Sequence, residues 1–100
     1  MDLDLNEFIH KAHGNAVNKG FWDKDIDFSS RVMLVVTELA EAVEADRHGD
    51  TEGVQEEIAD VFIRLADLCG GDERLTDIVK HIREKMEVNK KRPRLHGKEY

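Results

Sequence analysis

Two pairs of acidic residues have the side-chain types and the spacing that metal chemistry needs. Glu38 and Glu41 form one pair, and Glu57 and Asp60 form the other, each with i,i+3 spacing. On a helix this spacing places both side chains on one face, so two adjacent antiparallel helices would aim four carboxylates at one point. Such a group needs raised pKa values or a bound cation. Hard divalent cations prefer oxygen ligands. The pattern therefore predicts a Mg²⁺ site, with Mn²⁺ as a substitute, and metal-assisted chemistry on phosphates.

Other readings of the acidic pairs stay open at this point. Acidic residues at this spacing are common on solvated helix faces, but only Arg47 and Arg64 lie nearby, so ordinary salt bridges do not obviously account for the cluster. A ferritin-like di-iron site needs Glu-x-x-His on two helices, and no His follows Glu57 at that spacing. Zinc is disfavoured because the cluster has no Cys or His ligands.

The elements that would position these carboxylates are helices within a single domain, residues 1–100. Apolar periodicity, capping residues and glycine stops predict helices at about 3–18, 30–48, 51–69 and 72–91, followed by a basic tail at 92–100. The predicted N-cap of the second helix is Ser29 or Ser30, and Gly70 and Gly71 mark the end of the third. Period-two alternation is nowhere sustained, so we expect an all-α fold.

Composition narrows the partners and the location. The formal net charge is −7, whereas binders of nucleic-acid polymers are usually basic, so no nucleic-acid polymer is expected as a partner. No apolar stretch approaches a membrane span. The single cysteine, Cys69, and the acidic start of the chain predict a reduced, cytoplasmic protein without a signal peptide. Apolar residues almost all round the second helix predict a homodimer or a dimer of dimers.

Two segments together resemble a known family. Thr37-Glu38-Leu39-Ala40-Glu41, followed by Glu57-Ile58-Ala59-Asp60, is similar to the EExxE…ExxD signature of MazG-like nucleotide pyrophosphohydrolases. The series Lys85, Asn89, Arg92, His96-Gly97-Lys98 and Tyr100 resembles the end of short MazG-like proteins, and the Gly20-Phe21-Trp22 loop is also similar to theirs.

The resemblance implies a fold, an activity and a set of site residues. It implies a four-helix MazG-like bundle, completed by dimerisation, and Mg²⁺-dependent hydrolysis of a nucleoside triphosphate to the monophosphate and pyrophosphate, as in nucleotide-pool housecleaning. It makes Glu38, Glu41, Glu57 and Asp60 the metal ligands, through which they would be catalytic. It assigns substrate phosphate binding to Lys85, Asn89 and Arg92.

Three points remain open after the resemblance. Thr37 occupies the position of the first signature Glu, so the general base is unassigned, with Glu44, Glu56 or a metal-bound hydroxide as alternatives. Trp22 could stack on a nucleotide base or pack in the core or at an interface. The alternative function is a non-catalytic helical module that binds nucleotide or a partner and has a structural acidic cluster.

Overall fold

The computed structural model describes residues 4–97, and these residues form helices and no strand. The α-helices are α1 (Leu5–Asn18), α2 (Phe28–Arg47), α3 (Thr51–Gly71) and α4 (Ile78–Lys90), and two short 3₁₀ turns lie at Glu73–Leu75 and Arg94–Gly97. The all-α prediction is confirmed. Residue 3 at the predicted start of the first helix, and Lys98 and Tyr100 of the basic tail, lie outside the described residues.

Aspartate side chains cap the first three helices. Asp4, Asp27 and Asp50 each accept a hydrogen bond from the backbone N–H three residues further on, at 3.1, 3.2 and 2.9 Å, which satisfies a donor that the helix itself leaves unpaired. The predicted Ser29 or Ser30 cap of α2 is therefore wrong. Hydrogen bonding with the side chain of Ser30, and then with its backbone N–H, lowers the pKa of the Asp27 carboxyl. Because Asp27 takes this role, α2 begins at Phe28.

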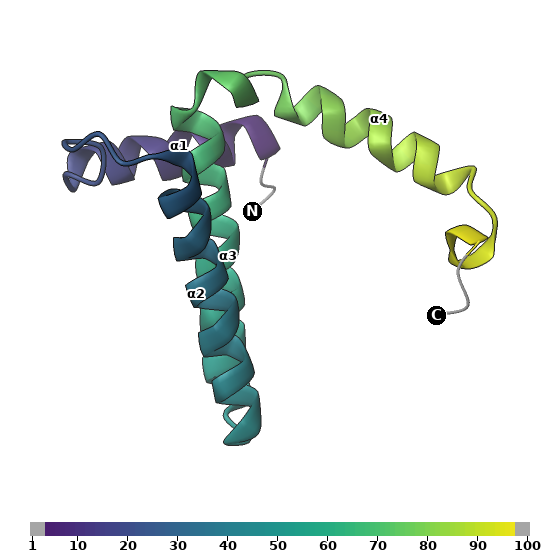
Figure 1. Cartoon of the computed structure of the whole chain (residues 1–100), viewed down its shortest axis with the longest axis horizontal. Coiled ribbons are helices and arrows are strands. Elements are labelled where there is room, and N and C mark those ends of the chain that lie inside the picture. Colours follow the sequence, from purple (N-terminus) through teal and green to yellow (C-terminus); the bar gives the residue numbers. More distant parts are fainter. Residues whose placement is uncertain (1–3, 98–100) are drawn as a thin grey trace.

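Helices α2 and α3 form an antiparallel hairpin that is the centre of the molecule (Figure 1). Its tight turn includes Gly49, whose φ of +67° lies in the left-handed region that glycine adopts without strain. The buried apolar side chains of the two helices are Val35 and Ala42 from α2 and Ala66 and Leu68 from α3. The hairpin therefore holds the two acidic segments side by side.

Helix α1 crosses α3 near its C-terminal end (Figure 1), and two glycines permit the close approach. A Cβ atom at Gly70 would lie 2.5 Å from the Cβ of His13 and 3.3 Å from the carbonyl oxygen of Ile9, and one at Gly71 would overlap the ring of Trp22. The prediction that α3 ends at residue 69 is wrong, because Gly70 and Gly71 serve as contact points within the helix.

Helix α4 is shorter than predicted and extends away from the hairpin (Figure 1). The predicted helix 72–91 is divided into the 3₁₀ turn at Glu73–Leu75 and α4 at Ile78–Lys90, and no residue of α4 is buried. A four-helix bundle is therefore not closed within one chain. Among the described residues, no helix combines the length and apolar character needed to cross a membrane.

Candidate metal centre

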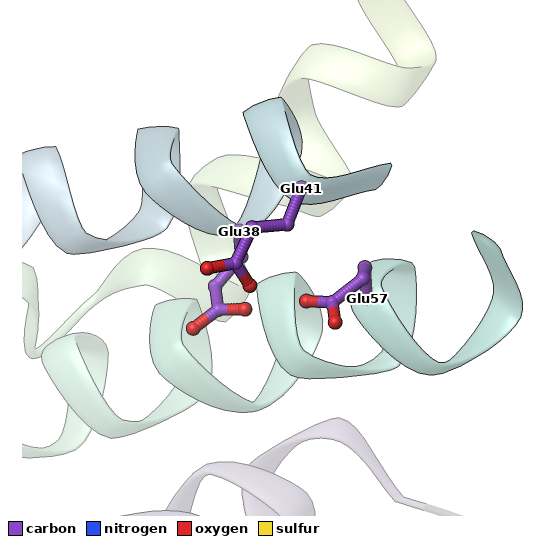
Figure 2. Close-up of side chains that lie close together, drawn as sticks. All are labelled: Glu38, Glu41 and Glu57. Carbon is purple, nitrogen blue, oxygen red and sulfur yellow. The ribbon is translucent and has the colours of Figure 1, made fainter. Parts of the chain in front are cut away.

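Three of the four predicted carboxylates meet in the seam of the hairpin. Glu38 and Glu41 project from α2 and Glu57 projects from α3 (Figure 2), and one oxygen of each lies within 4.8 Å of the others. The i,i+3 spacing on α2 places its two glutamates on one side of that helix. The antiparallel packing of α3 then brings Glu57 opposite them. The predicted convergence is thus observed for these three residues.

Arg64 neutralises part of this cluster. Its Nε donates a hydrogen bond of 2.8 Å to Oε1 of Glu38, which is 8% exposed. The hydrogen bond from Arg64, followed by one with Glu57, lowers the pKa of the Glu38 carboxyl. The expectation that salt bridges do not account for the acidic residues thus fails at Glu38. Arg64 follows Glu57 by about two helical turns on α3, which places the two side chains on one side of the helix, so its position in the sequence was a usable signal.

Glu57 is in the opposite electrostatic situation. Hydrogen bonding with Glu38 and then with Glu41, together with burial and the repulsion of these charges, raises the pKa of Glu57 to about 7. A carboxyl in this environment holds a proton that it shares with its neighbours, since like charges so close cannot all ionise easily. Its Oε2 is shielded from solvent and has no hydrogen-bond partner. An acceptor atom left in this condition is costly.

This donor set fits a hard divalent cation. All three groups offer carboxylate oxygens, the ligand type that Mg²⁺ and Mn²⁺ prefer, and Oε2 of Glu57 is an unused acceptor within the group. Loss of the shared proton would leave three carboxylates against the single Arg64 guanidinium, an excess of negative charge that a dication offsets. Glu38, Glu41 and Glu57 are therefore the residues that would hold the metal.

Asp60 is not part of this group. It lines a neighbouring pocket of about 210 Å³, together with Asn15 of α1, Phe21 of the following loop, and Glu38 and Arg64. At about 100° per residue, three positions along α3 turn the side chain about 60° away from Glu57, which directs Asp60 toward α1 rather than α2. The prediction of four converging carboxylates therefore gives three, with the fourth beside an adjoining pocket.

The predicted phosphate-binding residues are not brought to the cluster within one chain. Lys85 and Asn89 are exposed on α4, and exposed Arg92 follows it in the turn before Pro93. α4 does not pack along the hairpin (Figure 1). None of its side chains is buried, and the 3₁₀ turn at Glu73–Leu75 separates it from α3.

Trp22 is fixed by a polar network that the sequence reasoning missed. Its Nε1 donates a 2.8 Å hydrogen bond to Asp67, which also lies 3.0 Å from Nδ1 of His13. The guanidinium of Arg31 lies 3.6 Å from the centre of the indole ring, and His13 meets the ring edge-on at 5.0 Å. Packing is thus observed for Trp22, and the face under Arg31 is not free for a base.

Two signals could have revealed this network. A buried indole N–H requires an acceptor, and Asp67 falls on the same side of α3 as Asp60 and Arg64 at 100° per residue. Arg31 also donates to the carbonyl oxygens of Phe21 and Ile26, both at 3.3 Å, so it holds the loop between α1 and α2 against the hairpin. The network therefore shapes the pocket beside the carboxylates.

Comparison with known proteins adds no identification: neither a family model, nor a curated protein, nor a solved structure matches this chain.

Proposed function

We propose that this protein is a Mg²⁺-dependent nucleoside triphosphate pyrophosphohydrolase that acts in nucleotide-pool housecleaning. The observation that carries the proposal is the convergence of Glu38, Glu41 and Glu57 on one point, with one buried carboxylate oxygen unused. The MazG-like pattern of the sequence supports the same reaction. In that reaction water attacks the α-phosphorus, the bond to the oxygen bridging to the β-phosphorus breaks, and pyrophosphate leaves.

Each side chain of the cluster has a distinct task in this proposal. When bound, the dication would offset the charge of the triphosphate and polarise its phosphoryl oxygens. Glu41 is exposed and Glu38 is buried, so the pair links the solvent side of the site to its interior. Arg64 holds Glu38 in one orientation through its 2.8 Å hydrogen bond. Glu57 retains a proton near neutral pH and must release it before it can serve as a full anionic ligand.

The adjoining pocket supports a nucleoside site next to the carboxylates. It shares Glu38 and Arg64 with the cluster, and Phe21 at its rim is 59% exposed. An exposed aromatic ring offers a stacking surface that accepts any base, so Phe21 is better placed for this role than Trp22. Asn15 adds an amide for hydrogen bonding to a base or a sugar.

Lys85, Asn89 and Arg92 remain the proposed phosphate contacts. They are exposed donors on or just after α4, and the basic side chains suit the oxygens of a leaving pyrophosphate. Because α4 does not pack along its own hairpin, the proposal requires these residues to come from the α4 of a second chain.

The test is a panel of common and modified nucleoside triphosphates incubated with Mg²⁺, with identification of both products. We expect monophosphate and pyrophosphate from at least one triphosphate. Glu41→Gln should abolish this activity. Glu7→Gln is the matched control, because Glu7 is exposed on α1 and pairs with Lys11 rather than with the cluster. Absence of both products from every nucleotide, with the helices intact, would contradict the proposal.

One observation favours a second function, a non-catalytic nucleotide-binding or interaction module. The Arg64–Glu38 hydrogen bond and the proton shared by Glu57 satisfy part of the cluster without a cation. A structural cluster of this kind would tolerate Glu41→Gln without loss of function. Nucleotide binding that is unchanged by Mg²⁺ and gives no product would select this alternative.

A further inference from the structure

Arg64 brings a fixed positive charge to the carboxylates of the α2–α3 hairpin. Its Nε donates the 2.8 Å hydrogen bond to Oε1 of Glu38, and the two side chains are 39% and 11% exposed. The bond joins residues 26 positions apart in the chain, so it depends on the register of the two helices. The guanidinium stays charged across the physiological pH range, and the cluster therefore always has this cation beside it.

The surroundings of Arg64 keep its guanidinium at the cluster. Because Glu38 is nearly buried, breaking the pair would leave its charge without a partner, which is strongly unfavourable. Asp67, which lines the same pocket as Arg64 and Glu38, already accepts the hydrogen bond from Trp22 and lies against His13. A carboxylate can accept several hydrogen bonds or ligate a cation with its second oxygen, so Glu38 can serve Arg64 and a metal ion together.

The charges of the group balance with one dication and not with two. Glu38, Glu41 and Glu57 carry three negative charges when all are ionised, and Arg64 contributes one positive charge. One Mg²⁺ or Mn²⁺ brings the sum to zero. A second dication would leave two uncompensated positive charges in a partly buried site, which is unfavourable.

We infer that Arg64 is a built-in counter-cation of the metal centre, which takes the place of a second dication and lowers the affinity for the first. The inference rests on the metal centre of the proposed function, because it needs a dication at Glu38, Glu41 and Glu57. It goes beyond that function by fixing the stoichiometry at one metal ion per chain. Arg64 acts through Glu38, so it is a positioning residue and not a metal ligand.

Two opposing effects decide how Arg64 changes the metal affinity. A positive charge bonded to one of the ligands repels a dication, which lowers the affinity by about 100-fold or more at the dielectric of a protein surface. The hydrogen bond also orients Glu38, and loss of such an outer contact weakens metal binding by about 10–100-fold. A substitution that removes the charge and keeps the hydrogen bond therefore isolates the first effect, and it should tighten binding.

Arg64→Gln makes this separation. The amide nitrogen of glutamine is as many bonds from the backbone as Nε of arginine, which is the atom that donates to Glu38, so the variant keeps a donor at this position and loses the charge. In calorimetric titrations of Mn²⁺ into the metal-free protein at neutral pH, the wild type should bind one Mn²⁺ per chain at the cluster. Arg64→Gln should bind it about tenfold more tightly, since water screens part of the repulsion from the 39% exposed Arg64 side chain.

Arg74→Gln is the matched control for the loss of one positive charge. Arg74 also pairs with a carboxylate, that of Asp72 at 2.6 Å, and is exposed outside the cluster. This variant should bind Mn²⁺ with the wild-type affinity. Unchanged or weaker binding by Arg64→Gln, an equal gain in Arg74→Gln, or two Mn²⁺ ions at the wild-type cluster would overturn the inference.

Thermal unfolding decides the question if Arg64→Gln is poorly folded without metal. Stabilisation by a bound ion grows with the ratio of its concentration to its Kd. Millimolar Mn²⁺ should therefore raise the Tm of Arg64→Gln more than that of the wild type, and an equal or smaller rise would contradict the inference.

The inference and the proposed function fail in different experiments. Tighter Mn²⁺ binding by Arg64→Gln, with no product from any nucleotide, would remove the function and keep the inference. Product formation by the wild type, with an unchanged Mn²⁺ affinity in Arg64→Gln, would do the reverse. A wild-type protein that binds no Mn²⁺ at millimolar concentration would overturn both.

Discussion

Because the pKa of Glu57 is raised, the proposed metal binding should depend on pH in a defined way. Hydrogen bonding with Glu38 and Glu41 keeps the Glu57 proton in place up to about pH 7, and a carboxylate must lose its proton to ligate a cation. With a pKa of about 7, the ionised fraction of Glu57 rises about 25-fold between about pH 5.5 and pH 7.5. The association constant for Mn²⁺ or Mg²⁺ should rise by about the same factor over this interval and level off above it.

The free energy of unfolding of the metal-free protein should change with pH in the opposite direction to the metal affinity. The pKa of Glu57 is raised by folding from 4.5 to about 7, so the metal-free folded state binds the proton more tightly than the unfolded chain. The stability that this proton contributes is fully present below about pH 4.5 and is lost as the pH rises through 7. Glu38 and Asp27, whose pKa values are lowered, contribute stability that is lost only at acid pH.

Calorimetric titration of Mn²⁺ into the metal-free protein at the two pH values measures the first effect, and chemical denaturation measures the second. Glu57→Gln is the informative variant, because the amide resembles the neutral carboxyl in shape and cannot ionise. It should bind Mn²⁺ at least tenfold more weakly at pH 7.5 and should lose the pH dependence that Glu57 causes. An equal wild-type affinity at both pH values, or a dependence that persists in Glu57→Gln, would refute the reasoning.

Three further predictions concern the site and its support. Glu41→Gln should abolish turnover and leave the circular dichroism spectrum unchanged. Asp60→Asn should retain measurable turnover, because Asp60 lies outside the converging group. An equal loss of activity in the two variants, measured in steady-state assays, would place Asp60 among the metal ligands. Phe21→Ala should raise KM for triphosphates without changing Mn²⁺ affinity, and an unchanged KM would exclude stacking on this ring. Gly14→Ala should stabilise α1 by about 1 kcal/mol, because a Cβ at this position meets nothing within 4 Å. Gly70→Ala adds an overpacking cost of about 1–3 kcal/mol, because its Cβ would lie 2.5 Å from the His13 side chain of α1. Equal Tm values for the two variants would contradict the close packing of α1 on α3.

Local signals in the sequence were sufficient for the helices and for most of the acidic cluster. Capping residues, apolar periodicity and the Gly49 turn act over a few residues, so they predict an α2–α3 hairpin and the convergence of Glu38, Glu41 and Glu57. Asp60 was misplaced because i,i+3 spacing leaves a rotation of about 60° between side chains, and only the tertiary position of α1 decides which direction that rotation favours.

Local sequence signals could not predict the contacts between segments that are far apart in the chain. Gly70 and Gly71 were predicted to end the helix, because glycine often follows the last residue of a helix. In the structure they allow close contact with His13 and Trp22, which lie more than 40 residues earlier in the chain. The sequence also did not predict the orientation of α4, because the position of a helix with a weak apolar stripe depends on what it packs against. The pairing of Arg64 with Glu38 follows only once the two helices are in register.

The indole of Trp22 gives this fold an internal optical reporter. It is the only tryptophan in the chain, and its emission depends on the docking of one loop onto the end of α3, where Asp67, His13 and Arg31 surround it. A protonated imidazole is a common quencher of indole emission, so brightness and wavelength together distinguish a docked loop from a released one. Fluorescence can therefore follow the loop that borders the pocket beside the carboxylates, independently of the helices that carry them.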